Sequence, residues 1–173
     1  MRPVLSACIA VLVFALAGAA DAGAPRPAKP VHPERFFGTW YEVARTPNPA
    51  QKGCFAAVAR WSRAADGRIS VVNSCRKGSP TGPEQTWKGV GRVIDAAAAR
   101  VSVAFLGGVM KQEYWVLDRA DDYSWSIMGT PGGNYVWVFS RKPVLTPAEK
   151  NALMARVKAL GYNVSKLELA GRN

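Results

Sequence analysis

Eight short runs of β-favouring residues, separated mostly by breaks that carry Gly, Pro or Asp, constrain the fold of this chain more than any other feature. The runs span residues 36–44, 55–61, 68–73, 85–94, 100–105, 112–117, 123–129 and 134–140. They show no internal repeat, and no long helical pattern interrupts them. Short strands with this spacing are typical of an antiparallel barrel or sandwich, so the sequence predicts an all-β fold.

One helix is expected after the eighth run. Residues 146–149 read Thr-Pro-Ala-Glu, which is a capping box with proline at the first helical position. Apolar residues recur at helical spacing from Leu153 to Leu160, and Gly161 then ends the pattern. The sequence therefore predicts a helix over residues 146–161.

The first 22 residues have the pattern of a secretory signal peptide. A short cationic start is followed by an apolar run over residues 4–17, and Ala-Asp-Ala at 20–22 suits a signal peptidase. The apolar run is short for a membrane span, and the lipobox-like residues 5–8 precede most of it. We therefore predict a cleaved signal peptide over residues 1–22, no lipid anchor, and a periplasmic or secreted protein.

Residues 23–33 contain four prolines and no apolar periodicity, so they are expected to form an extended or disordered flexible linker. Residues 34–173 fit one domain. The linker holds the only histidine of the chain, His32. A single histidine in a flexible leader cannot supply the base of a catalytic triad or build a His-rich metal cluster.

Two cysteines, Cys54 and Cys75, remain after cleavage and flank two β-favouring runs joined by a turn that ends in Asp-Gly. If these runs pair as a hairpin centred between residues 64 and 65, the cysteines lie opposite each other. In an exported protein this placement favours a disulfide. The spacing is not that of a CxxC redox motif, and two thiols without histidine make a poor zinc site.

Three short motifs occur in a fixed order along the chain. Gly38 and Trp40 form a Gly-x-Trp on the first run, Asp122 and Tyr123 lie between the sixth and seventh runs, and Arg141 follows the eighth. Together these residues resemble the motifs of the lipocalins, in particular the bacterial lipocalins of the outer-membrane lipoprotein type and their relatives around apolipoprotein D.

The resemblance extends over residues 33–169. It implies an eight-stranded antiparallel up-and-down barrel, followed by the C-terminal helix and a short ninth strand at 165–169. Asp121 stands where the family usually has threonine, which affects only the capping of that turn. By the same resemblance, Arg141 closes the base of the barrel over Trp40 as a cation–π lid, so both residues are interpreted as structural.

An eight-stranded barrel is wide enough either to be filled by side chains or to hold one small ligand. The resemblance turns seven side chains toward the lumen or the ligand: Trp61, Val71, Tyr114, Val116, Met128, Tyr135 and Trp137. A filled core and a ligand wall explain these residues equally well.

The resemblance implies that the protein binds and carries a small hydrophobic ligand, such as a fatty acid, a lysophospholipid or a similar lipid, in the cell envelope. One alternative is a lipocalin-fold enzyme that acts on a lipophilic substrate, for which Tyr114, Tyr135 and Glu42 are the available titratable groups. Another is an envelope stress protein with a vestigial cavity.

The formal net charge is +11, but the Lys and Arg residues are scattered along the chain rather than concentrated in one tract. We therefore expect no nucleic-acid partner, and we expect transient contact with an anionic membrane surface. Asp118, Asp121 and Asp122 form a tight acidic cluster that is interpreted as a solvated turn. No nucleophile motif is present, and neither a cofactor nor a metal is expected.

Overall fold

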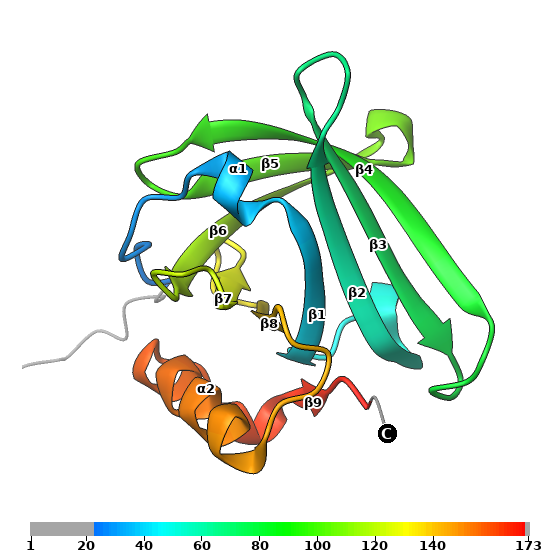
Figure 1. Ribbon diagram of the computed structural model, residues 1–173, viewed down its shortest axis with the longest axis vertical. Coiled ribbons are helices and arrows are strands. Elements are labelled where there is room, and N and C mark those ends of the chain that lie inside the picture. Colours follow the sequence, from blue (N-terminus) through cyan, green and yellow to red (C-terminus); the bar gives the residue numbers. More distant parts are fainter. Residues whose placement is uncertain (1–22, 172–173) are drawn as a thin grey trace, which may run out of the picture.

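The computed structural model describes residues 23–171, which form an antiparallel barrel with one helix packed against its outside (Figure 1). The predicted signal peptide lies outside the described residues. Among residues 23–171, no helix has the length and apolar character needed to cross a lipid bilayer. The predicted all-β barrel with one C-terminal helix is confirmed.

Eight strands follow one another around the barrel, and each pairs antiparallel with the next. The last of them pairs with the first, which closes the sheet. The strands are β1 (Gly38–Arg45), β2 (Cys54–Arg63), β3 (Ile69–Lys77), β4 (Glu84–Asp95), β5 (Arg100–Phe105), β6 (Met110–Arg119), β7 (Trp125–Gly129) and β8 (Val136–Ser140). The short ninth strand, β9 (Glu168–Leu169), pairs with the C-terminal end of β1 at Ala44 and Arg45.

The two ends of the barrel differ. A short helix, α1 (Pro33–Phe36), lies at the end that carries the β2–β3, β4–β5 and β6–β7 turns (Figure 1). The opposite end carries the 3₁₀ helices η1 (Pro49–Gln51), between β1 and β2, and η2 (Leu106–Gly108), between β5 and β6. We call the first the closed end and the second the open end.

The C-terminal helix α2 (Pro147–Ala159) lies against the outer face of β1, β7 and β8, and η3 (Val164–Lys166) leads from it to β9 (Figure 1). Its predicted capping box is present, with the Thr146 hydroxyl accepting from the Glu149 backbone N–H at 3.2 Å. Leu153 and Val157 are buried against apolar side chains on the outer face of the strands. The helix therefore covers an apolar outer surface that the barrel would otherwise expose.

Residues 23–33 lie along the barrel instead of forming a free linker. The Ala24 N–H donates to the Pro131 carbonyl at 2.9 Å, and the Val31 N–H donates to the Ala96 carbonyl at 3.0 Å. A proline-rich extended backbone makes no internal hydrogen bonds, so its polar groups are available to pair with the barrel. Composition alone indicates an extended segment but does not show that it has a surface to bind.

The predicted disulfide between Cys54 and Cys75 is confirmed, with the two Cα atoms 5.4 Å apart. The predicted register of this hairpin is wrong, because Cys54 pairs with Lys77 rather than with Cys75. The last pair before the turn is Arg63 with Ile69, which places the centre of the turn beyond the predicted position. The two cysteines are diagonal neighbours on one face, close enough for the bond.

Candidate ligand-binding cavity

A cavity of about 600 Å³ occupies the barrel and reaches the open end. Most of its lining is apolar or aromatic and comes from the inward positions of the strands, where every second side chain faces the lumen. Its size lies within the range of known small-molecule sites. The barrel is therefore not filled by its own side chains.

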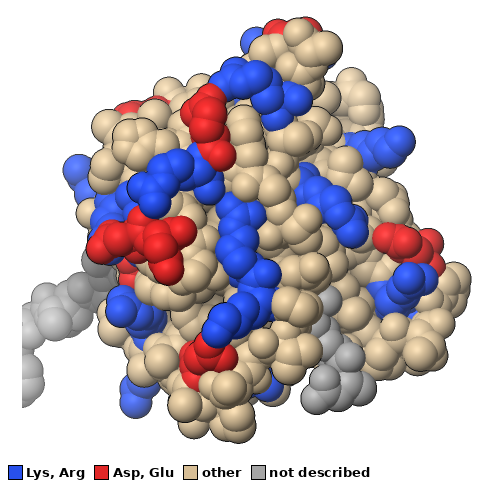
Figure 2. Space-filling model, in the orientation of Figure 1, with Lys and Arg blue, Asp and Glu red and all other residues tan. Residues whose placement is uncertain are grey.

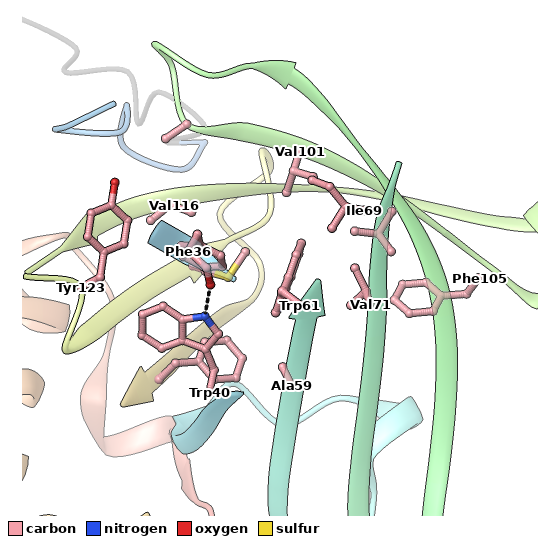
Figure 3. Close-up of a cluster of buried hydrophobic side chains, with 14 residues drawn as sticks. Phe36, Trp40, Ala59, Trp61, Ile69, Val71, Val101, Phe105, Val116 and Tyr123 are labelled. Carbon is pink, nitrogen blue, oxygen red and sulfur yellow. Dashed lines mark hydrogen bonds between the residues drawn. The ribbon is translucent and has the colours of Figure 1, made fainter. Parts of the chain in front are cut away.

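Aromatic residues fill the closed end (Figure 3). Trp40 is fully buried, and its indole N–H donates to the Phe36 carbonyl at 2.8 Å. The Phe36 and Trp61 rings form a T-shaped pair, with ring centroids 5.5 Å apart. A second space of only about 40 Å³ lies beyond these rings, so a ligand chain has no passage of comparable size through this end.

Arg141 covers Trp40 as the resemblance implied, with its guanidinium carbon 3.6 Å from the ring centroid. The same guanidinium donates to the carbonyls of Thr39 and Phe37, both at 2.9 Å. Burial lowers the pKa of Arg141 from its usual value, although the side chain still satisfies several backbone acceptors. Arg141 therefore ties the end of β8 to the segment that leads into β1, which is a role in the fold.

The second motif supports the same end of the barrel. Tyr123 is buried, and its hydroxyl accepts a hydrogen bond from the His32 backbone N–H at 3.0 Å. Asp122 accepts from the Ser124 backbone N–H at 2.9 Å, and its hydrogen bonds to Ser124 hold its pKa below the usual range. Gly38 has a φ of 107°, and a Cβ atom there would lie 3.1 Å from the Arg141 guanidinium. Only glycine meets both conditions without strain.

The seven side chains predicted to face the lumen are placed as follows. Trp61, Val71, Tyr114, Met128 and Trp137 line the cavity. Val116 is buried in the core at the closed end and lines only the small space there. Tyr135 precedes β8 and does not line the cavity, although its ring lies 5.9 Å from that of Trp137.

Tyr114 and Trp137 form an edge-to-face pair on the cavity wall, with ring centroids 5.7 Å apart. Burial raises the pKa of the Tyr114 phenol to about 12. The phenol is therefore neutral at physiological pH and offers a hydrogen bond without a charge.

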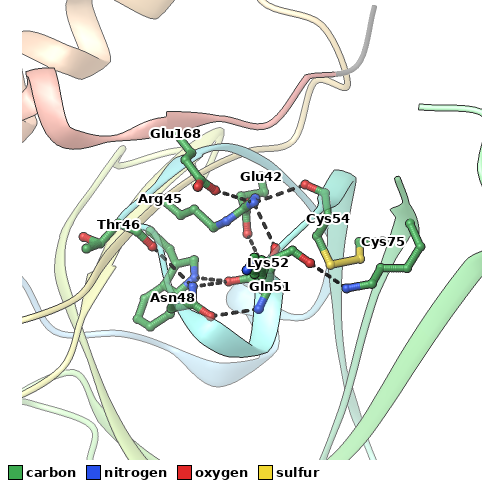
Figure 4. Close-up of polar contacts among 11 residues, drawn as sticks. Glu42, Arg45, Thr46, Asn48, Gln51, Lys52, Cys54, Cys75 and Glu168 are labelled. Carbon is green, nitrogen blue, oxygen red and sulfur yellow. Dashed lines mark hydrogen bonds and ion pairs between the residues drawn. A yellow bond between two sulfur atoms is a disulfide. The ribbon is translucent and has the colours of Figure 1, made fainter. Parts of the chain in front are cut away.

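A polar group lies on the wall formed by β1 and η1 and joins Glu42, named above as a titratable candidate, to residues that the sequence did not indicate (Figure 4). Glu42 and Arg45 form an ion pair at 2.6 Å, and both side chains are almost fully buried. Gln51 donates to the second Glu42 oxygen at 2.8 Å and accepts from the Trp137 indole N–H at 2.8 Å. Asn48 donates to the same Gln51 oxygen at 2.9 Å.

Glu42 lines the cavity, as its place two residues after Trp40 allows, because strand alternation puts both residues on one face. Phe105 could have been found in the same way on the run 100–105. Asn48 and Gln51 lie in a connection, where no periodic pattern applies. Their place in the cavity depends on how η1 folds back over the open end.

The rim of the open end carries exposed apolar side chains. Leu106, Val109 and Met110 lie in or beside η2, and Val109 is 88% exposed. Lys111 is the second residue of β6, next to Met110. Lys52 directly follows η1 at the same end of the barrel. The rim therefore combines an apolar tip with basic side chains.

The carboxylates of the acidic cluster at the end of β6 and in the turn after it, Asp118, Asp121 and Asp122, have different partners. Asp118 pairs with Arg156 at 3.3 Å, and Asp121 pairs with Lys29 at 2.8 Å. Within residues 23–171, no group of three or more His, Cys, Asp or Glu side chains is arranged to hold a metal ion.

Figure 2 shows Lys and Arg side chains in several small groups over one face, with Asp and Glu among them.

Comparisons with known proteins agree with this architecture. A family model described as a lipocalin-like domain matches residues 31–171. The chain is 30% identical over 137 residues to the outer membrane lipoprotein Blc of Citrobacter freundii, covering 78% of this chain and 75% of that protein. It is 26% identical over 144 residues to apolipoprotein D of Mus musculus, covering 78% and 73%. Among solved structures, insecticyanin of Manduca sexta has the same fold, with a TM-score of 0.68 at 19% identity over 84% of this chain and 82% of that one.

Proposed function

Because the chain belongs to the lipocalin family, we propose that it binds a small hydrophobic ligand with an acyl chain, such as a fatty acid, a lysophospholipid or a similar lipid, and carries it in the cell envelope. The observation that carries this proposal is the cavity of about 600 Å³, which is mostly apolar and is blocked at one end by Phe36, Trp40 and Trp61. An acyl chain in such a space would bury its methylenes against apolar side chains, and this burial would supply most of the binding free energy.

Binding explains the lining better than catalysis does. A general acid or base works best with a pKa near the operating pH, and the pKa of Tyr114 lies far above it at about 12. Glu42 is already engaged by Arg45 and Gln51, and Tyr135 does not line the cavity. The same open cavity argues against a vestigial site, in which side chains would fill the lumen.

The envelope location rests on the leader pattern of residues 1–22 and on the relative from Citrobacter freundii, which is named an outer membrane lipoprotein. We propose export of this chain with cleavage before Gly23 rather than acylation at Cys8, because Cys8 precedes most of the apolar run. A disulfide between Cys54 and Cys75 suits an oxidising compartment.

Affinity should increase with acyl-chain length until the cavity is filled. Each added methylene should raise the association constant about fourfold, from roughly 0.8 kcal/mol of burial free energy. Titration of lipid-free protein with an acyl series, followed by tryptophan fluorescence, measures this slope. Trp137→Ala should weaken binding, whereas Trp115→Phe on the outer face of β6 should not. Absence of saturable binding at every chain length would refute the carrier function.

We also propose that the open end contacts anionic membranes during loading or release. The exposed Leu106, Val109 and Met110 would enter the interfacial region of the bilayer, while Lys52 and Lys111 would face the lipid headgroups. Apolar insertion and basic attraction to anionic lipid act together in such contacts.

Val109→Asp should reduce binding to phosphatidylglycerol vesicles about tenfold, because it removes an apolar contact and adds a charge of the wrong sign. Vesicle co-sedimentation at low salt measures this effect. Ile94→Asp is the matched control, since Ile94 is also exposed but lies at the closed-end part of β4. Equal losses for the two variants would mean that general electrostatics, not the open end, governs the contact.

A further inference from the structure

Glu42 is an unusual residue for the wall of a lipid cavity. Its side chain is 2% exposed, and it lies among apolar and aromatic neighbours that include Phe139 and Trp137. A buried ion pair such as Glu42–Arg45 is weak evidence for stabilisation, because the cost of desolvating two charges offsets their attraction. The position of the carboxylate on the cavity wall suggests a role toward the ligand.

The Arg45 guanidinium is surrounded by more negative charge than it can balance. The guanidinium pairs with Glu42 at 2.6 Å and with Glu168 at 2.7 Å, so two carboxylates share one cation. These three side chains alone therefore carry a formal charge of −1, and Lys88 lines the same cavity from β4. Of these three side chains, Glu42 alone contributes to the cavity lining.

The chemistry of the polar atoms on this part of the cavity wall decides which ligand group fits there. An ionised carboxylate accepts hydrogen bonds and cannot donate them, whereas the amide NH₂ of Gln51 has two donor hydrogens. Gln51 directs one of them to Glu42 and is held in place by the Trp137 indole N–H. A ligand atom that both donates and accepts, such as a hydroxyl oxygen, satisfies this pair. A ligand ammonium also satisfies Glu42, but a ligand carboxylate places like charges together.

We propose that Glu42 and Gln51 form a subsite for the polar end of the ligand, and that this end is a hydrogen-bond donor, a hydroxyl or an ammonium, rather than a free carboxylate. The inference rests on the proposed function, since it assumes that an acyl chain occupies the apolar part of the cavity. It narrows the ligand class to acyl or alkyl lipids that carry a donor near the end of the chain.

The test compares four ligands with a twelve-carbon chain on the same folded protein: dodecanol, dodecylamine, dodecanoate and methyl dodecanoate, each below its solubility limit or micellar concentration. Dodecanol or dodecylamine should bind about tenfold or more tightly than dodecanoate, as expected for one charge-assisted hydrogen bond. The methyl ester has no donor and should also bind weakly. A gain for dodecylamine alone would identify the donor as an ammonium, and a gain for both would include the hydroxyl.

Glu42→Gln should remove the preference, because the amide supplies donors and carries no charge. Glu113→Gln is the matched control, since Glu113 pairs with Arg100 and does not line the cavity, so the ligand ratio should stay unchanged. If Glu42→Gln does not fold, Gln51→Leu should lower the preference for dodecanol while keeping the ion pair. Equal affinity for all four ligands, or tightest binding of dodecanoate, would overturn the subsite and leave the carrier function intact. Binding of none of them would instead count against the carrier function.

Discussion

Replacement of Arg45 by methionine should lower the free energy of unfolding by about 3–5 kcal/mol, because it leaves the Glu42 carboxylate buried without its cation. The guanidinium also donates to the Cys54 carbonyl at 3.1 Å and pairs with Glu168 of β9, so the variant loses contacts between three segments. Urea unfolding monitored by tryptophan fluorescence measures the loss.

The double variant Arg45→Met with Glu42→Leu should recover most of this stability, since no buried ion is left uncompensated and the remaining Glu168 side chain is 47% exposed. Arg100→Met is the matched control, because the Arg100–Glu113 pair is partly exposed and should contribute less than about 1 kcal/mol. If the single and double variants are equally unstable, lost packing rather than the buried charge explains the effect.

Replacement of Cys54 and Cys75 by serine should lower the free energy of unfolding by about 3 kcal/mol, as expected for a bond that closes a loop over a sequence separation of 21. The barrel should still fold, because the main aromatic core lies at the closed end and does not include the two cysteines. Urea unfolding of the wild type and the variant, with and without reductant, measures the difference.

Reductant should destabilise the wild type to the level of the variant and should leave the variant unchanged. A wild type that unfolds at the same urea concentration with and without reductant would contradict the expected contribution. Ligand affinity measured well below the unfolding transition separates this effect from any change in the cavity.

Most of the fold could be predicted because β-favouring runs, turn residues and the capping box are local signals. The run 100–105 coincides with β5, and Thr146 caps α2 as expected. The register of β2 and β3 could not be predicted, because the connection from Arg63 to Ile69 is longer than the tight turn that Asp-Gly indicates, which shifts every pair of the hairpin. A bulge between Phe55 and Val58 changes the register again by one residue, and an extra residue of this kind leaves no mark in a pattern of alternating polarity.

The same limit explains why the buried ion pair was missed. In a regular strand, Glu42 and Arg45 would face opposite sides of the sheet, since they are three residues apart. A bulge between Glu42 and Ala44 adds one residue to β1. Ala44 is then buried beneath α2, and Arg45 returns to the side of Glu42. Alternation counted from Trp40 predicts the Glu42 position correctly and gives the wrong side for Arg45.

The blocked end of the barrel sets the order of events in ligand exchange. Trp40 and Arg141 leave no route of comparable size at that end. A lipid whose polar end binds Glu42 and Gln51, as proposed above, would therefore enter tail first and leave with its polar end leading. A second molecule cannot push the first out from behind, so each round of loading requires complete release of the previous ligand. The rate of ligand exchange should therefore depend on the surface that the open end faces. A membrane at that end would donate the ligand during loading and accept it during release.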